Sequence, residues 1–247
     1  MIGPLERIAA KLDRADEHIA QFESEARIFL NKDTSANLLY KDPHVKEAFE
    51  QFHANRPVPL QLSVVAGEAV YHLRSTLDHI ACALILKGGG TITLDSQFPI
   101  ERFKPTTPKD LRRYERKIRG IAAEPLALIE RVQPYHAQNA RDRHWLAVLK
   151  RLNNFDKHQS LVLHVVRFKR GAHFTIRDTQ SGTEGQMTIS YTNGTKRLVD
   201  VVNVQSQVSA YIAFGEVTKR DDVDVLSILR PLATITRKVV RGFEPFL

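Results

Sequence analysis

The stretch RDRHWLAVLKRLNNFDKHQSLVLHVVRF, residues 141–168, contains the change of pattern that decides the fold. Its first part repeats apolar residues at steps of three and four, as in Trp145, Leu149 and Leu152, which predicts a helix over residues 141–159. From Leu161 the period changes from near 3.6 to 2, which is typical of strands. Strands are predicted at 161–168, 173–177, 186–192, 196–204 and 208–217, with a tight hairpin turn at Asn193-Gly194.

Helical periodicity also occurs on both sides of this stretch. Apolar residues recur along 4–31, along 62–86 up to a run of three glycines, along 122–132 and along 225–241. Residues 32–60 contain several prolines and predict no single element. The sequence therefore predicts an α+β fold in one domain, 1–247, in which an antiparallel bundle of four to five helices carries an antiparallel β-meander inserted before the C-terminal helix. The bundle comprises residues 4–31, 62–86, 122–159 and 223–241, and the meander comprises residues 161–217.

The composition is that of a basic globular protein. The 247 residues are 43% hydrophobic and 26% charged, which argues against gross disorder. The formal net charge is +8 and the sequence pI is about 9.6. This charge favours anionic partners such as nucleic acid, nucleotides or acidic lipid, and it is equally compatible with simple solubility.

Nothing in the sequence indicates export or a membrane span. The single cysteine, Cys82, lies in the apolar run 80–86, so an intrachain disulfide or a zinc ribbon is excluded and a small core residue is expected. That run is the longest apolar stretch and is too short to cross a bilayer. The N-terminus turns amphipathic at once, so no signal peptide is expected. We therefore expect a cytoplasmic protein with no membrane partner.

Two predicted helices carry polar groups that a plain bundle does not need. Arg74, Asp78 and His79 lie on helix 62–86, and Asp156 continues the inward stripe of helix 141–159. A carboxylate on the core-facing side is costly unless it is paired. We therefore expect Asp156 to meet Arg74, with His79 or Tyr135 nearby. Such a cluster can serve acid–base chemistry, or it can be only a structural brace between helices.

The spacing of the arginines and histidines separates two pairs. Arg151 and His158 are seven residues apart, so they lie on the same face of a helix. Arg74 and His79 are five apart, about 140° around an ideal helix, and do not meet on a straight one. They can form one site only at a helix end, at a kink, or where a second chain completes it.

A strongly basic stretch covers residues 109–119. Such a stretch can bind the phosphates of a nucleic acid, with Phe103 and Tyr114 available to stack on bases. The alternative is a solvated helix face. Together with a residue of helix 141–159, the candidate nucleic-acid-binding residues are Lys109, Arg112, Arg113, Arg116, Lys117 and Arg151.

The two Arg/His pairs resemble a known motif. Arg74-x4-His79 and Arg151-x6-His158 are similar to the Arg-x(4–6)-His signature of HEPN domains, helical bundles found in many prokaryotic toxin and defence ribonucleases. A wider pattern also resembles a group of uncharacterised bacterial proteins over roughly residues 60–160. That pattern comprises residues 67–79 (GEAVYHLRSTLDH), Gln97-Phe98-Pro99-Ile100, Gln133-Pro134-Tyr135 and Asp156-Lys157-His158.

The HEPN resemblance implies a metal-independent endoribonuclease without a cofactor, acting on RNA and usually forming its site across a homodimer. The arginine would hold the scissile phosphate, and the histidine would assist attack by the ribose 2′-hydroxyl. A guanidinium can grip phosphate through two hydrogen bonds, and imidazole exchanges protons near neutral pH. Arg74 and His79 form the first candidate pair, with supporting or second-site residues Asp78, Asp156 and His158.

Two other functions stay open. A metal-dependent hydrolase would use Asp78, His79, Asp156 and His158 as ligands of manganese, iron or zinc. Against this, adjacent residues such as Asp78 and His79 point about 100° apart on a helix, and no His-Glu-x-x-His motif occurs. The other alternative is a non-enzymatic nucleic-acid-binding or scaffold protein that uses the basic stretch.

Overall fold

The computed structural model describes residues 2–34, 57–159, 161–177, 184–189, 203–215 and 223–247. Backbone contacts divide the chain into two compact units. The first unit comprises Met1–Glu25, Pro59–Leu163 and Phe214–Leu247, and the second comprises Ala26–Val58 and His164–Ala213. The sequence-based prediction of a single domain over 1–247 stays a prediction. At the coarse level the predicted combination of a helical bundle with an antiparallel sheet is confirmed.

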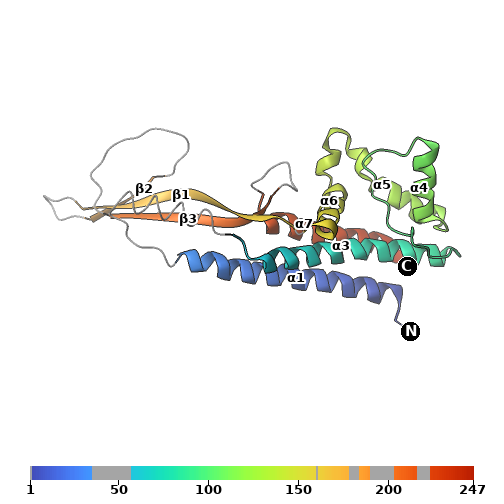
Figure 1. Ribbon diagram of the computed structural model, residues 1–247, viewed down its shortest axis with the longest axis horizontal. Coiled ribbons are helices and arrows are strands. Elements are labelled where there is room, and N and C mark those ends of the chain that lie inside the picture. Colours follow the sequence, from blue (N-terminus) through green and yellow to red (C-terminus); the bar gives the residue numbers. More distant parts are fainter. Residues whose placement is uncertain (1, 35–56, 160, 178–183, 190–202, 216–222) are drawn as a thin grey trace. The chain divides into compact units, whose positions relative to one another are not determined.

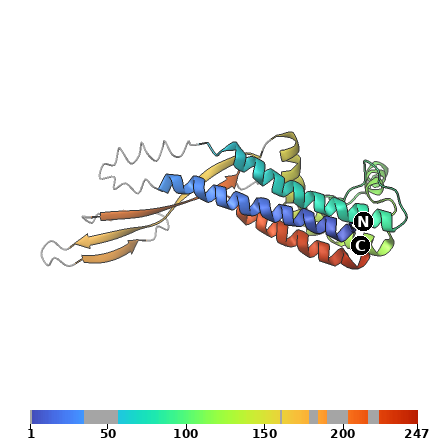
Figure 2. The same ribbon diagram turned by 90° about the horizontal axis from the view of Figure 1, so that it is seen from below.

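Three long helices are α1 (Pro4–Thr34), α3 (Leu60–Lys87) and α7 (Val225–Phe243). In the first unit α3, α7 and the part of α1 up to Glu25 lie side by side, as Figures 1 and 2 both show. The predicted helices 4–31, 62–86 and 225–241 correspond to these elements. Ion pairs join α1 to α7, one between Arg237 and Asp16 and one of 2.5 Å between Arg230 and Glu23. Because the later residue of α7 meets the earlier residue of α1, the two helices are antiparallel.

Helix α3 lies at the centre of this unit and packs against α6 (Trp145–His158) as well as α7. Its buried residues, among them Leu73, Leu77 and Ile80, occur on more than one side, which is what a helix with several packed neighbours requires. It ends where the three glycines begin, because Gly88 donates its N–H to the carbonyl of Leu84 and Gly89 takes a positive φ of 81°. Cys82 is half-buried on this helix.

Two short helices follow. The basic stretch forms α4 (Pro108–Ile118), which Thr107 caps by accepting a hydrogen bond from the Asp110 N–H at 3.2 Å. The predicted helix 122–132 is α5 (Ala123–Arg131), with Pro125 in its first turn. The predicted helix 141–159 begins later than expected, at Trp145. The residues before it belong to the 3-10 segment η1 (Pro134–Arg143), which Gln138 interrupts with a φ of 44°.

The chain ends with α7 and a short segment that follows it. Asp224 caps α7 by accepting from the Ser227 N–H at 2.9 Å. A short 3-10 segment η2 (Glu244–Phe246) then ends beside α3, where the Lys87 ammonium donates to the Leu247 carbonyl oxygen. Among the residues that the structure describes, no helix is long and apolar enough to cross a membrane.

Three strands are described, β1 (Leu163–Arg177), β2 (Glu184–Ile189) and β3 (Asn203–Phe214), in the order β2-β1-β3. Strands β1 and β2 pair antiparallel, in a register that runs from Ala172 opposite Ile189 to Arg177 opposite Glu184. At the other edge Gly215 donates its N–H to the Val162 carbonyl, so the end of β3 lies beside the start of β1.

The sheet differs from the prediction in three respects. The strands expected at 161–168 and 173–177 are one continuous strand, β1, which runs through Gly171 without a turn. The strands expected at 186–192 and 208–217 occur at 184–189 and 203–214. Since β3 is next to β1 and not to β2, the described strands do not follow a meander. The expected Asn193-Gly194 turn and residues 196–202 lie outside the described residues.

Candidate functional site

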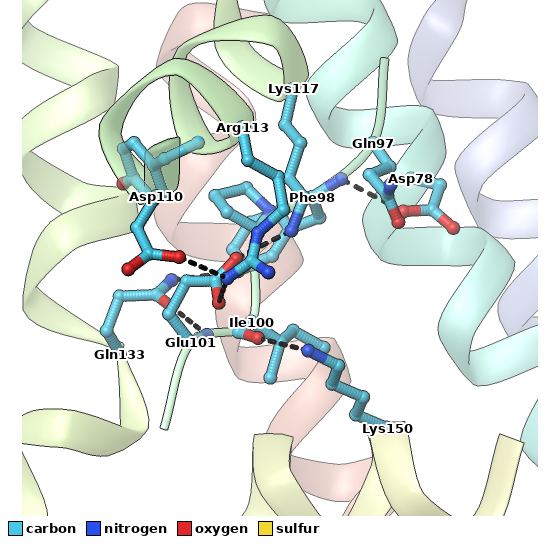
Figure 3. Close-up of polar contacts among 12 residues, drawn as sticks. Asp78, Gln97, Phe98, Ile100, Glu101, Asp110, Arg113, Lys117, Gln133 and Lys150 are labelled. Atoms are coloured by element: carbon cyan, nitrogen blue, oxygen red, sulfur yellow. Dashed lines mark hydrogen bonds and ion pairs between the residues drawn. The ribbon is translucent and has the colours of Figure 1, made fainter. Parts of the chain in front are cut away.

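Arg74 and Asp78 hold the loop that follows α3. Arg74 donates from Nη2 to Asp78 Oδ1 at 2.7 Å, to the Phe98 carbonyl at 2.8 Å and to Gln97 Oε1 at 3.3 Å. Asp78 Oδ1 in turn accepts the Phe98 N–H at 2.9 Å (Figure 3). The pair therefore fastens both backbone polar groups of Phe98, whose ring is fully buried and meets the ring of Phe243 edge-on.

The same loop is held from its other side by Gln133, which directly precedes η1, and by Lys150 of α6. Gln133 accepts the N–H of Glu101 and donates to the Pro99 carbonyl, each at 2.9 Å, while Lys150 donates to the Ile100 carbonyl at 2.8 Å (Figure 3). Buried backbone groups outside regular structure need such partners. Residues 97–101 are therefore the point on which α3, α4, η1 and α6 converge.

Glu101 closes this network electrostatically. Its buried carboxylate accepts from Lys117 of α4 at 2.6 Å and lies 3.6 Å from Arg113, as Figure 3 shows. A buried carboxylate is tolerated here because the two cations compensate its lost hydration. From the sequence, no role was proposed for Glu101 or Lys150. The motifs Gln97-Phe98-Pro99-Ile100 and Gln133-Pro134-Tyr135 were quoted without a contact assigned to Gln133.

Burial controls the titration of the Arg74–Asp78 pair. Removal from water lowers the pKa of the Arg74 guanidinium, and the nearby Asp78 carboxylate opposes that shift. Burial raises the pKa of Asp78, against the opposing effects of Arg74 and the Phe98 N–H. Only 8% of Arg74 is exposed, and its Nη1 is buried with no hydrogen-bond partner in the described part of the chain. Arg74 is thus a brace whose hydrogen-bonding atoms face the interior.

His79 lies on another side of α3. Burial lowers the pKa of its imidazole, and Lys11 of α1 lowers it further, whereas Asp78 raises it. Arg74 instead reaches toward residues 97–98. The two side chains diverge, as five-residue spacing on a straight helix requires. Within this chain, Arg74 and His79 do not line a common site.

The expected pair of Asp156 and Arg74 is not formed. Asp156 of α6 lies against Gly67 of α3, close enough that a Cβ on Gly67 would come within 2.0 Å of Asp156 Oδ1. Gly67 is seven residues before Arg74, or about 10 Å along the helix axis. The pKa of Asp156 is raised by burial and then by the carboxylate of Glu68. Tyr135, expected nearby, donates instead to Glu130.

Asp156 lines a cavity of about 320 Å³ between α3 and α6, together with Ser63, Val64, Glu68 and Tyr71. Behind it, Glu68 Oε2 lies 3.2 Å from Nδ1 of the buried His18, whose ring stacks on that of His72 at 5.4 Å. Burial lowers the pKa of His72, and the neighbouring Lys11, His18 and Arg14 lower it further. The Asp156 carboxylate thus faces a second carboxylate and no arginine.

The metal-binding interpretation is not supported by this geometry. Among all residues that the structure describes, including Asp78, His79, Asp156 and His158, no three histidine, cysteine or acidic side chains are placed to hold one ion. Asp78 is engaged with Arg74 and Phe98, and Asp156 lies at Gly67. His158 is exposed at the end of α6, where no described contact joins it to Arg151.

The basic residues of α4 divide into three groups by what they contact. Lys117 and Arg113 turn toward Glu101. Arg116 lies 3.3 Å from Asp95, with both side chains more than half exposed, and such surface pairs contribute little. Lys109 and Arg112 are exposed and have no partner among the described residues. Tyr114, expected to stack on bases, is instead buried and donates to Glu130 at 2.6 Å.

Comparison with known proteins adds no homologue to this description. The chain matches no protein-family model, no curated protein and no solved structure.

Proposed function

We propose that this protein binds RNA through the exposed cationic face of α4. The proposal rests on the position of four cations on one side of that helix. At 100° per residue, Lys109, Arg112, Arg116 and Arg119 fall within an arc of about 80°. All four are exposed. Their Cα atoms extend over about 15 Å along the helix axis.

The rest of α4 explains why these cations point outward. Tyr114 and Ile118 are buried on the opposite face. Lys117 and Arg113 occupy a flank, where Glu101 pairs with both and Asp110 also pairs with Arg113. The outer face therefore keeps its charge, and three of its four cations lack an acidic partner in the described structure. A row of unneutralised cations on one face suits a phosphate backbone, which is the sequence-independent part of nucleic-acid recognition.

RNA cleavage of the HEPN type would require an arginine that can reach a phosphate. Arg74 donates to three acceptors inside the protein and is almost fully buried, so it does not suit this role. Arg151 and His158 are the remaining pair with the motif spacing. We therefore assign binding to α4 and keep metal-independent cleavage by Arg151 and His158, with a homodimer completing the site, as the second candidate.

Binding is tested by fluorescence anisotropy with labelled RNA at several salt concentrations. We expect Lys109→Gln/Arg112→Gln to weaken binding and to reduce the slope of log K against log salt by about 1.4, since each phosphate contact contributes about 0.7 on a single strand. Lys238→Gln/Arg241→Gln on α7 is the matched control. It removes one lysine and one arginine at the same spacing from exposed positions, so it lowers the net charge equally.

Two results would overturn the proposal. One is wild-type protein that binds no RNA near physiological salt. The other is an equal loss of affinity in both double variants, which would show that only net charge matters. The cleavage candidate is tested with the same RNA in EDTA, comparing wild type with His158→Ala and His79→Ala. Cleavage that survives EDTA and His79→Ala, and is lost with His158→Ala, would support the Arg151/His158 pair.

A further inference from the structure

An exposed phenylalanine lies among arginines just before α4. Phe103 is 63% exposed, so one face of its ring is accessible to a ligand. The Arg141 guanidinium lies 4.5 Å from the centre of its ring, and that of Arg102 lies 5.8 Å from it. Both distances are within the range of cation–π contacts.

The charges of this cluster do not balance. Asp142 forms an ion pair with Arg102 and is the one acidic side chain that the described contacts place here. Two guanidiniums beside one carboxylate leave one positive charge uncompensated.

We propose that Phe103, Arg102 and Arg141 form a subsite for one unpaired nucleotide of single-stranded RNA, with the base stacked on Phe103 and the adjacent phosphate held by the two arginines. This inference rests on the proposed RNA-binding function and names its substrate class. It concerns residues outside the cationic face of α4.

A nucleotide can displace the arginine that covers Phe103, because the cation–π contact is weaker than the stacking contact that replaces it. Stacking of a base on an aromatic ring is stronger than a solvent-exposed cation–π contact, so a base can replace a guanidinium on Phe103. The displaced arginine then becomes free to grip phosphate through two hydrogen bonds. Bases within a duplex are already stacked and paired, so duplex RNA cannot fill the subsite.

The experiment compares a labelled uridine 12-mer with a blunt RNA duplex of equal length, binding to full-length protein. Phe103→Leu removes the ring and keeps an apolar side chain, whereas Phe103→Trp keeps a stacking surface. We expect Phe103→Leu to weaken binding of the uridine 12-mer about tenfold and to leave duplex binding unchanged. Phe103→Trp should bind the 12-mer about as tightly as wild type. Leu94→Ala, at another fully exposed apolar residue, is the control and should change neither.

A second readout does not depend on affinity. The introduced tryptophan of Phe103→Trp should lose fluorescence on adding the uridine 12-mer, beyond any change from Trp145 in wild type. Two results would refute the inference while RNA binding through α4 persists. In one, Phe103→Leu binds the 12-mer like wild type. In the other, Phe103→Leu loses the same amount of affinity for the 12-mer and for the duplex. If wild-type protein binds neither RNA, the proposed function itself fails, and the subsite falls with it.

Discussion

Asp156 of α6 is in direct contact with the backbone of α3 at Gly67, and the contact leaves no room for a side chain there. A Cβ added to Gly67 would lie 2.0 Å from Oδ1 and 2.5 Å from Cγ of Asp156. Glycine inside a helix normally costs about 1 kcal/mol relative to alanine. The close approach of the two helices explains why glycine occurs at this position.

Gly67→Ala should therefore destabilise the protein, although alanine favours helix. The expected net loss is about 1–3 kcal/mol in the free energy of unfolding, because Asp156 or the α6 backbone must move. Gly242→Ala on α7 is the matched control, since a Cβ there meets nothing within 4 Å and alanine should stabilise by about 0.5–1 kcal/mol. Urea unfolding measures both. Equal effects of the two substitutions would contradict the close contact.

Arg74→Met should be among the most destabilising substitutions in the first unit. It leaves the partly buried Asp78 carboxylate without its cation and removes a donor from the Phe98 carbonyl, which costs about 1–3 kcal/mol. Arg74→Lys should recover little, because an ammonium cannot reproduce the geometry of the guanidinium. Thermal unfolding against the exposed Arg14→Met tests this, since the Arg14–Glu17 pair should contribute less than about 1 kcal/mol. A small effect of Arg74→Met would refute the bracing role.

Asp156→Asn should change how stability depends on pH. Burial, followed by repulsion from Glu68, raises the pKa of Asp156 above its ordinary value of 3.8. The folded state therefore binds more protons than the unfolded state just above pH 3.8, and this contribution to stability is lost as pH rises through the raised pKa. Relative to wild type, the asparagine variant should gain stability as pH rises across that window. Denaturant midpoints measured at a series of pH values give the difference, and a constant difference would contradict the shift.

His72→Gln should make the protein more tolerant of mild acid. Burial and the nearby Lys11, His18 and Arg14 lower the pKa of His72 below 6.5, so the folded state binds fewer protons than the unfolded state between the two values. Stability from this group is present above pH 6.5 and is lost as pH falls through the lowered pKa. Unfolding curves at pH 7.5 and at lower pH should show a smaller acid loss for the variant. Because glutamine also alters the stack with His18, the comparison rests on the slope with pH and not on absolute stability.

Some contacts of the polar residues could be predicted from the geometry of a single helix, whereas others depend on how two helices pack. The divergence of Arg74 and His79 follows from helical geometry alone, and the structure places them near different elements. The neighbour of Asp156 depends on where α6 crosses α3. An inward-facing carboxylate could be predicted from the stripe of α6, but its contact is an interhelical glycine about 10 Å from Arg74.

The basic stretch shows the same division within a single element. Its charge and its helical spacing are visible in the sequence, whereas the partner of each cation is not. Glu101, which neutralises Lys117 and Arg113, precedes α4 by a loop and reaches them only because Gln133 and Lys150 hold that loop. Burial of Tyr114 against Glu130 likewise depends on the packing of α4 on α5.

By itself, the sequence determined the long helices α1, α3 and α7, the glycine stop at Gly88, and the presence of antiparallel strands after α6. Periodicity, caps and turn residues act over a few neighbours, so they can be recognised without the fold. Only the tertiary structure decided that β3 lies beside β1, that Arg74 braces Phe98 and that Asp156 meets Gly67. These relationships join distant segments, and their energies arise from packing and desolvation that no local pattern contains.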